Sequence, residues 1–378
     1  MTIDLHTKLY PLSESRKLSL HDLLEYFVQQ GTMRVSDLHM KVGSPPVYRF
    51  DGRLQKLKGP PLDGPVLAAL LGVLLSEADR QEMERSGSVD SSYSHGSLQF
   101  RLNCFKDNEG PAIAMRALDQ SPIALEAIGF PNDVWKDIIT KQHGLVLVTG
   151  ITGAGKSTTI ASLITRIAAE RACRIITLED PIEYRLKGHA ALISQREVGR
   201  DVPDFARGLR DCLREDPDVI FVGEMRDRES TRWTLSAAET GHLVFSTLHT
   251  RDVRGSITRL LDMFPFNQQE EIANQLSLGL SHILSQKLVP RADGQGRVVA
   301  MEVLNNNYAM ANLIRQAKVE QMYSVLQTKV RDIPAERMIT MEYALAQLAH
   351  TGQIAEADAA QFANNPNEFL SALRHLSA

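Results

Sequence analysis

The 378-residue chain has only three cysteines, and their spacing offers no pair for a metal or a disulfide bond. Cys104, Cys173 and Cys212 lie far apart, and no Cys-x-x-Cys motif occurs. This spacing excludes a cysteine-based structural zinc site and a disulfide framework. We therefore expect the three thiols to act as small buried hydrophobic groups.

Long hydrophobic runs are also missing from the chain. The longest apolar run, Val66–Leu75, is too short to span a bilayer. The N-terminus has no charged segment followed by an apolar one, which a secretory signal would need. We therefore expect a cytoplasmic protein.

The chain has no large excess of charge of either sign. Its formal net charge is −4, and no run of basic residues occurs, so we expect no nucleic-acid partner. A hydrophobic fraction of 43% and a charged fraction of 23% are ordinary for a globular protein. The length is sufficient for two or three domains.

The sequence pattern divides the chain into five regions. We expect residues 1–19 to form a loose extension and residues 20–117 to form a small α+β domain, because short alternating segments are separated there by turn signals. Residues 118–131 contain prolines and a glycine, which are typical of a linker. We expect an α/β core over residues 132–292 and a helical C-terminal region over residues 293–378.

Apolar strands alternate with helical stretches in the core region, which favours a parallel sheet covered on both faces. The pattern beyond Gly255 becomes helical, interrupted only near Pro290. The strands that we expect are Leu145–Thr149, Arg174–Leu178, Asp218–Val222 and Leu243–Ser246.

A glycine-rich loop between an apolar strand and a helix carries the strongest chemical signal. The stretch Gly150-Ile-Thr-Gly-Ala-Gly-Lys-Ser157 fits the P-loop pattern. Its glycines allow backbone N–H groups to face a β-phosphate, and the following helix presents its positive end. Lys156 would reach the β- and γ-phosphate oxygens, and the hydroxyl of Ser157 would hold Mg²⁺. The alternative is a glycine-rich turn without a ligand.

Glu224 is the candidate general base. It follows the apolar strand Asp218–Val222, and ligands bind at the carboxyl ends of strands in open α/β sheets. An ionised glutamate can accept a proton from the water that attacks the γ-phosphate. The alternative is a structural acid at the start of a helix. Arg226 lies nearby and would form a structural ion pair or contact phosphate.

A second group of acids follows the strand Arg174–Leu178. Glu179, Asp180 and Glu183 could lie beside the γ-phosphate and its metal, because close acids need a cation or a donor nearby. The alternative is that they are solvated loop residues.

His242 and His249 flank the strand Leu243–Ser246 and its continuation. A single histidine is more often structural than catalytic, and the spacing alone does not decide between these roles.

Four stretches in this order resemble motifs of the secretion ATPase superfamily: its Walker A, Asp box, Walker B and His box. The resemblance is closest to the pilus retraction ATPases of the PilT type, whose motifs are similar to Gln195–Val198, Gln286–Val289 and Lys318–Ser324. The stretches that resemble the Walker A, Asp box, Walker B and His box are residues 150–159, 176–184, 213–227 and 238–250, respectively.

The resemblance implies a homohexameric ring of a PAS-like N-terminal domain hinged to a RecA-like ATPase core. It implies ATP and Mg²⁺ as ligands, and Glu224 as the catalytic acidic residue. Glu179, His242 and His249 carry over as supporting catalytic positions. Arg101 and Arg116 resemble arginines that approach the γ-phosphate. The nucleotide-binding positions are Gly150, Thr152, Gly153, Ala154, Gly155, Lys156, Ser157 and Thr158, with Ser157 as the contact to Mg²⁺.

The same resemblance implies a motor for type IV pilus retraction at the inner membrane, where an inner-membrane platform protein and a paralogous pilus ATPase would be partners. The absence of a four-cysteine zinc element favours the retraction branch over the extension and secretion branches. One motif differs from the family pattern Ala-Ile-Arg-Asn-Leu-Ile-Arg-Glu, because Ala311 replaces an arginine and Gln316 replaces a glutamate. An accessory paralogue that tunes another motor, and a nucleic-acid translocase, remain as alternatives.

Overall fold

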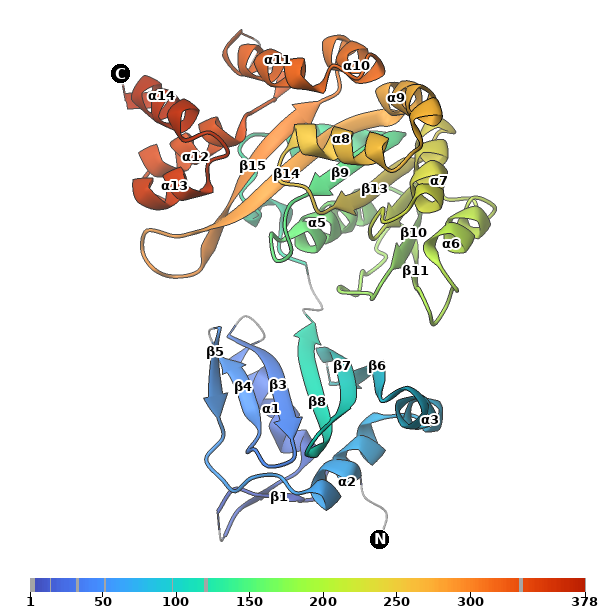
Figure 1. Cartoon of the computed structure of the whole chain (residues 1–378), viewed down its shortest axis with the longest axis vertical. Coiled ribbons are helices and arrows are strands. Elements are labelled where there is room, and N and C mark those ends of the chain that lie inside the picture. The colour runs from blue at the N-terminus through green and yellow to red at the C-terminus, as the bar shows by residue number, and fades with distance from the viewer. Residues whose placement is uncertain are drawn as a thin grey trace. The chain divides into compact units, whose positions relative to one another are not determined.

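The chain divides into two compact units, residues 1–121 and residues 122–378, and each unit has its own sheet (Figure 1). The computed structural model describes residues 4–13, 15–31, 34–50, 52–96, 98–118, 122–332 and 336–377. Residues 119–121 of the expected linker lie outside this description. Each unit is described separately below.

The N-terminal unit is built on a six-stranded antiparallel sheet of order β5-β4-β3-β8-β7-β6, beside a two-stranded β1-β2 ribbon. The strands are β1 (Tyr10–Pro11), β2 (Lys17–Leu18), β3 (Val35–Lys41), β4 (Val47–Phe50), β5 (Arg53–Lys56), β6 (Ser88–His95), β7 (Leu98–Asp107) and β8 (Gly110–Leu118). The helices are α1 (Leu20–Gln30), α2 (Gly64–Leu74) and α3 (Glu77–Ser86).

One face of this sheet forms the core of the N-terminal unit. Leu38 of β3 lies opposite Met115 of β8, and both are buried in one cluster with apolar residues of α1 and α2. The expected extension over residues 1–19 is not loose throughout, because Tyr10 and Leu18 are buried in this cluster. The hydroxyl of Tyr10 also donates to the carbonyl oxygen of Pro60 at 2.9 Å. Two isolated apolar side chains give no periodic signal, so the sequence did not indicate this packing.

The second unit is built on a seven-stranded sheet of order β11-β10-β12-β13-β9-β14-β15. The strands are β9 (Gly144–Thr149), β10 (Arg174–Glu179), β11 (Leu192–Glu197), β12 (Val219–Val222), β13 (Leu243–Leu248), β14 (Leu280–Pro290) and β15 (Arg297–Asn305). The helices are the 3-10 helix η1 (Leu125–Ala127), α4 (Val134–Thr140), α5 (Lys156–Glu170), α6 (Phe205–Cys212), α7 (Arg228–Glu239), α8 (Val253–Asp262), α9 (Phe266–Gly279), α10 (Tyr308–Arg315), α11 (Val319–Asp332), α12 (Met341–His350), α13 (Glu356–Phe362) and α14 (Pro366–Ser377).

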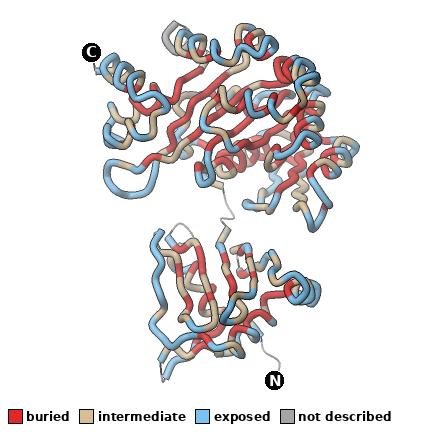
Figure 2. Tube along the Cα trace, viewed as in Figure 1, coloured by how far each residue is buried: buried red, intermediate tan, exposed pale blue. Residues whose placement is uncertain are grey.

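Two cores cover the two faces of this sheet. Leu145 and Leu147 of β9 belong to a cluster with residues of α6 to α10, whereas Val146 and Val148 belong to a cluster with residues of α4, α5 and α12. The central strands are therefore buried on both faces (Figure 2). In this sheet each of the neighbouring pairs from β11 through β10, β12, β13 and β9 to β14 is parallel, and β15 is antiparallel to β14. The predicted parallel sheet with two covered faces is present.

The expectation of a helical pattern beyond Gly255 is wrong for two segments, which form β14 and β15. Strand β14 lies between β9 and β15 and is largely buried, so its sequence shows no clear two-residue alternation. The expected helical region 293–378 therefore contains a strand before α10 to α14. The expected linker also packs partly against the second unit, because Leu125 is buried in its core.

The cysteines are unpaired, as their spacing predicts, and Cys104 and Cys212 are buried. Burial raises the pKa of both thiols to about 12, so they remain protonated at neutral pH. Cys173 is only half-buried. Over the described ranges, no helix combines the length and the apolar character that crossing a membrane requires.

Candidate active site

The glycine-rich loop and three candidate residues lie at one edge of the large sheet. Strands β9, β10, β12 and β13 are parallel, so their carboxyl ends meet at the same edge. The glycine-rich loop follows β9, Glu179 ends β10, Glu224 follows β12 and His249 follows β13. Open α/β sheets bind ligands at this edge.

The loop after β9 has a backbone that only glycine fits at its first position. Gly150 has φ +149°, and a Cβ atom there would lie 2.5 Å from the carbonyl oxygen of Gln286. Gly155 has φ +86° and caps α5 without a side-chain hydrogen bond. The first N–H groups of α5 therefore remain available to an anion, beside the positive end of the helix.

Lys156 places its ammonium group inside this loop. It donates to the carbonyl oxygens of Gly150 and Ile151 at 3.0 and 3.3 Å, and it lies 3.4 Å from Nδ1 of His249. Burial lowers the pKa of Lys156, while the carboxylates of Glu224 and Glu183 oppose this shift. A phosphate would supply the negative charge that this half-desolvated ammonium lacks.

His249 connects Lys156 to the candidate base. An ammonium can only donate, so Nδ1 of His249 accepts from Lys156 and Nε2 carries the ring proton. Nε2 then faces Oε1 of Glu224 at 3.5 Å. Glu224 also accepts from Nε of Arg226 at 2.7 Å, and Arg226 pairs with Asp180 at 3.0 Å. The structure thus brings Glu224 and His249 to the glycine-rich loop.

Glu179 lies at the same edge but is buried. Its Oε1 accepts from the hydroxyl of Thr177 at 2.6 Å and from Nε2 of Gln195 at 3.0 Å. Burial raises the pKa of Glu179 to about 7, although these hydrogen bonds favour the charged form. At neutral pH this carboxyl group can therefore hold or release a proton.

The raised pKa of Glu179 predicts a pH-dependent stability. Because the folded state holds this proton up to about pH 7, whereas the unfolded chain releases it near pH 4.5, stability falls as pH rises through this window. We expect the free energy of unfolding of the wild type, relative to Glu179→Gln, to fall by about 3 kcal/mol between pH 4.5 and 8. Urea unfolding of both proteins between pH 4.5 and 8 measures this difference in the free energy of unfolding. A difference that is independent of pH would contradict the prediction.

The structure does not bring His242 to this group. It precedes β13, whereas His249 follows it, so the two histidines lie at opposite edges of the sheet. Nδ1 of His242 contacts the carbonyl oxygen of Ala237 at 3.0 Å and the hydroxyl of Thr240 at 3.2 Å. Within this chain His242 contacts the end of α7 and not the glycine-rich loop, and its supporting catalytic role stays a prediction.

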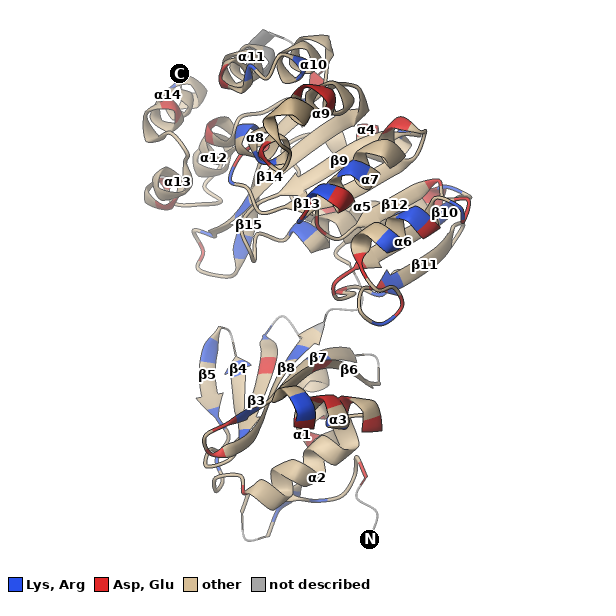
Figure 3. Cartoon of the chain, turned by 45° about the vertical axis from the view of Figure 1, so that its right-hand side comes forward, with Lys and Arg blue, Asp and Glu red and all other residues tan. Residues whose placement is uncertain are grey.

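Arg101 and Arg116 lie side by side on the polar face of the small sheet. Arg101 of β7 is the register partner of Arg116 of β8, which lies opposite Asp37 of β3. Asp37 is only 4% exposed and accepts from Nε of Arg116 at 2.8 Å, with Arg49 on its other side at 3.4 Å. An acidic segment of β3 accordingly lies between basic segments of β4 and β8 (Figure 3). The two arginines therefore share one surface of the N-terminal unit.

Gln286 is a site residue whose role the sequence did not indicate. From β14, its Nε2 donates to the carbonyl oxygen of Ala154 at 2.5 Å, and its Oε1 accepts from the hydroxyl of Thr159 at 3.0 Å. It is 1% exposed, so it holds the loop from within the core. The next residue, Lys287, donates to the carbonyl oxygen of Phe362 and to Asn364, both at 2.6 Å. The polar residue Gln286 within a largely apolar stretch was the sequence signal that could have indicated this role.

Replacing Gln286 with alanine should impair nucleotide binding. The change leaves a carbonyl oxygen and a hydroxyl without their partner inside the core, and it frees the loop to move. We expect the KM for ATP to rise about tenfold, equal to about 1.4 kcal/mol. Steady-state hydrolysis measures this, with the exposed Gln321→Ala as the control. An unchanged KM in a folded variant would show that Gln286 does not position the loop.

The remaining loop residues fit a triphosphate with a divalent cation. Ser157 begins the first turn of α5 beside Lys156, and its hydroxyl is an oxygen ligand of the kind Mg²⁺ prefers. The hydroxyl of Thr158 lies 2.8 Å from that of Tyr184. Thr152 and Gly153 are exposed at the tip of the loop. A hollow of about 880 Å³ lies beside Asp180 and Arg226 and extends along α6.

Comparisons with known proteins agree with this geometry. Residues 34–361 match the model of the family described as type II/IV secretion system protein. The type IV pilus retraction ATPase PilT of Pseudomonas aeruginosa is 38% identical over 353 residues, which cover 93% of this chain and 100% of that protein. The twitching motility protein of Neisseria gonorrhoeae is 38% identical over 321 residues, covering 85% and 84% of the two chains.

A solved structure extends the likeness to three dimensions. The crystal structure of the pilus retraction motor PilT with bound ADP has a TM-score of 0.86 and 41% sequence identity, and the match covers 94% of this chain and 100% of that one. The predicted α/β secretion ATPase fold is thereby confirmed. The chain belongs to the type II/IV secretion system protein family.

Proposed function

We propose that the chain hydrolyses ATP at the loop after β9. The contacts among Lys156, His249 and Glu224 carry this proposal, because they join an ammonium group suited to phosphate with a carboxylate suited to act as a base. Lys156 and the N-terminal end of α5 would bind the phosphates, and Ser157 would hold Mg²⁺. Mg²⁺, when bound, neutralises charge on the β- and γ-phosphate oxygens. Glu224 orients the attacking water and accepts its proton.

We further propose that this hydrolysis drives type IV pilus retraction. The likeness over nearly the whole chain to a retraction ATPase and to a retraction motor with ADP supports this function. The working form is a homohexamer, because an ATP-driven ring needs a closed heterologous interface between like subunits. Hinge motion between the two units would bring Arg101 and Arg116 to the γ-phosphate, as a mobile arginine stabilises its charge.

The proposed motor works in the cytoplasm at the base of the pilus. An inner-membrane platform protein is the partner that receives the motion, and a paralogous pilus ATPase is a further partner. The proposed domains are residues 20–117, 132–292 and 293–378, preceded by residues 1–19 and joined by residues 118–131.

Two measurements on one sample test this proposal. Purified protein with Mg²⁺ and ATP should release phosphate, and native mass measurement with a non-hydrolysable analogue should show six chains. A deletion strain should lose pilus retraction and regain it with the wild-type gene. A monomer without turnover would overturn the proposed motor.

An accessory role is the second candidate function, and the changed motif on α10 favours it. Ala311 lacks the guanidinium of the family pattern, and Gln316 binds Oδ1 of Asn312 at 3.0 Å without a charge. A protein altered at these positions would bind nucleotide but would modulate a second motor. A deletion strain that still retracts its pili, and fails only when the second motor is weakened, would support this role.

A further inference from the structure

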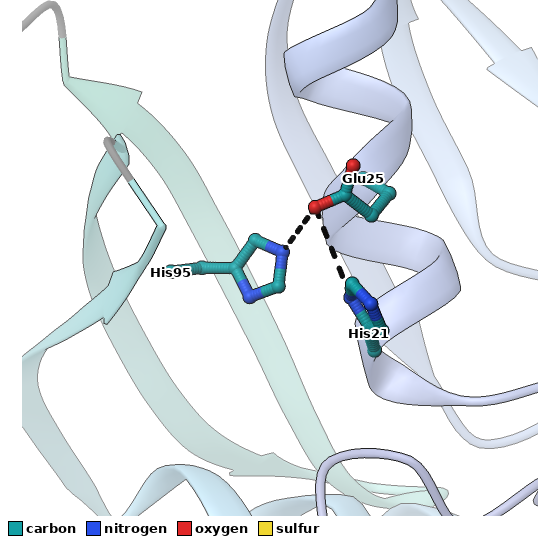
Figure 4. Close-up of side chains that lie close together, drawn as sticks. All are labelled: His21, Glu25 and His95. Carbon is teal, nitrogen blue, oxygen red and sulfur yellow. Dashed lines mark hydrogen bonds and ion pairs between the residues drawn. The ribbon is translucent and has the colours of Figure 1, made fainter.

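Two histidines and a glutamate lie close together in the N-terminal unit. His21 and Glu25 are one turn apart on α1, and His95 is the last residue of β6 (Figure 4). Nε2 of His95 lies 2.9 Å from Oε1 of Glu25, and Nδ1 of His21 lies 3.8 Å from the same oxygen. One ligand atom from each residue lies within 4.8 Å of the other two.

The local sequence fixes the positions of these side chains. Ser19 and Asp22 form a capping box that starts α1 at Leu20, so His21 stands in its first turn. Residues four apart on a helix share one face, which brings Glu25 next to His21. The backbone N–H of His21 also donates to the carbonyl oxygen of Leu5 at 3.0 Å, which holds the N-terminal segment against this turn.

His21 provides an independent sign of a missing ligand. Its Nδ1 atom is buried and has no hydrogen-bond partner, because 3.8 Å to Glu25 is too long for such a bond. The ring of His6 stands edge-on to the ring of His21 at 4.5 Å and shields it. A buried imidazole nitrogen that has no hydrogen-bond partner and lies near a carboxylate suits a shared cation.

The chemistry and spacing of the three donors fit zinc. Two imidazole nitrogens and one carboxylate oxygen form a common zinc ligand set, with water in the fourth position. Zinc bonds to nitrogen and oxygen ligands are about 2.0–2.1 Å long, and tetrahedral geometry then places neighbouring ligand atoms about 3.3 Å apart. The distances of 2.9 and 3.8 Å in the structure lie on either side of that value. Small side-chain rotations would therefore complete the site.

The charges around the cluster favour a divalent cation. With neutral imidazoles, the three side chains carry one negative charge, which comes from Glu25. Lys8 of the N-terminal segment pairs with Asp22 at 2.5 Å. His95 is only 6% exposed, so its side of the site is shielded from water. With neutral imidazoles, a zinc ion here would change the net charge of the cluster from −1 to +1.

We propose that the N-terminal unit binds one Zn²⁺ ion through Nδ1 of His21, the carboxylate of Glu25 and Nε2 of His95. The ion connects the first turn of α1 to the end of β6, two segments about 70 residues apart in the chain. It involves no residue of the glycine-rich loop.

The test is zinc binding by the full chain without nucleotide or Mg²⁺. Metal-free protein is titrated with Zn²⁺ in competition with a coloured chelator, and we expect one ion per chain. His21→Gln and Glu25→Gln should each weaken binding by about 100-fold or more, because outer-shell changes alone cost 10–100-fold. Both positions are partly exposed, so both variants should keep the wild-type circular dichroism spectrum. The control is the exposed His350→Ala, which should bind zinc like the wild type.

Cobalt provides a second readout at the same site. Co²⁺ bound by two histidines and a glutamate in tetrahedral geometry should give a visible absorption band, and the band should be lost in His21→Gln. Equal zinc affinity in the wild type and both variants would place the ion elsewhere and overturn the proposal. Absence of zinc binding by the wild type would overturn it as well. Neither result depends on whether the chain hydrolyses ATP.

Discussion

Replacing Glu224 with glutamine is expected to lower ATP turnover by about 10²–10⁴-fold, the usual contribution of a positioned general base. Glutamine keeps the size of the side chain and can still contact Arg226, but it cannot accept a proton from water. Lys156 and the N-terminal end of α5 remain unchanged, so ATP should still bind with close to wild-type affinity. Phosphate release and nucleotide binding, measured on the same protein, separate these two effects.

A matched substitution controls for the loss of one negative charge. Glu170 lies at the end of α5 and pairs with Arg166 on the surface, so Glu170→Gln changes the same chemical group away from the loop. We expect its turnover to stay within about twofold of the wild type, as for most exposed ion pairs. Equal turnover in Glu224→Gln and the wild type would exclude Glu224 as the base.

Replacing Gly150 with alanine is expected to disable the loop by a purely steric route. The new Cβ atom would lie 2.5 Å from a backbone oxygen of Gln286 and 2.9 Å from Cβ of Ala154, and neither atom belongs to a flexible side-chain end. Strain at φ +149° adds to this clash. We expect a loss of about 3 kcal/mol in the free energy of unfolding. A loop displaced by about 1 Å should lower turnover about 10²-fold.

Gly153 provides the control within the same loop. Its φ is +79°, but a Cβ atom there would meet nothing within 4 Å. Gly153→Ala should therefore add only backbone strain, about 1 kcal/mol. Urea unfolding and phosphate release compare the two variants. If both lost the same stability and turnover, contact with Gln286 would not be the cause.

The sequence predicted the fold best where strand and helix patterns alternate. Strands β9, β10, β12 and β13 were expected from short apolar runs, each followed by a polar or glycine-rich turn. Strand β14 was missed because it is buried on both faces beside β9, so its run of apolar residues resembles a helix that continues from α9. Its pairing with β9 links residues more than 130 positions apart, and no local pattern reports such a contact.

The candidate site shows the same division between local and distant information. The glycine-rich loop and Glu224 were predicted because each follows an apolar strand, and parallel strands bring such residues to one edge. A role for His249 was expected only from the resemblance to the secretion ATPases. His242 precedes its strand, and the same rule places it at the far edge. Gln286 could not be assigned a role, because its contacts with Ala154 and Thr159 depend on the neighbour of β9 in the sheet.

Gln286 and Lys287 are adjacent residues of a strand, and successive side chains of a strand point to opposite faces. Gln286 donates to the carbonyl oxygen of Ala154, and Lys287 donates to the carbonyl oxygen of Phe362 at the end of α13 and to Asn364 beyond it. A rigid peptide bond therefore separates two attachments on opposite sides of β14. We therefore expect a displacement of the loop at Ala154 to be transmitted through β14 to the end of α13.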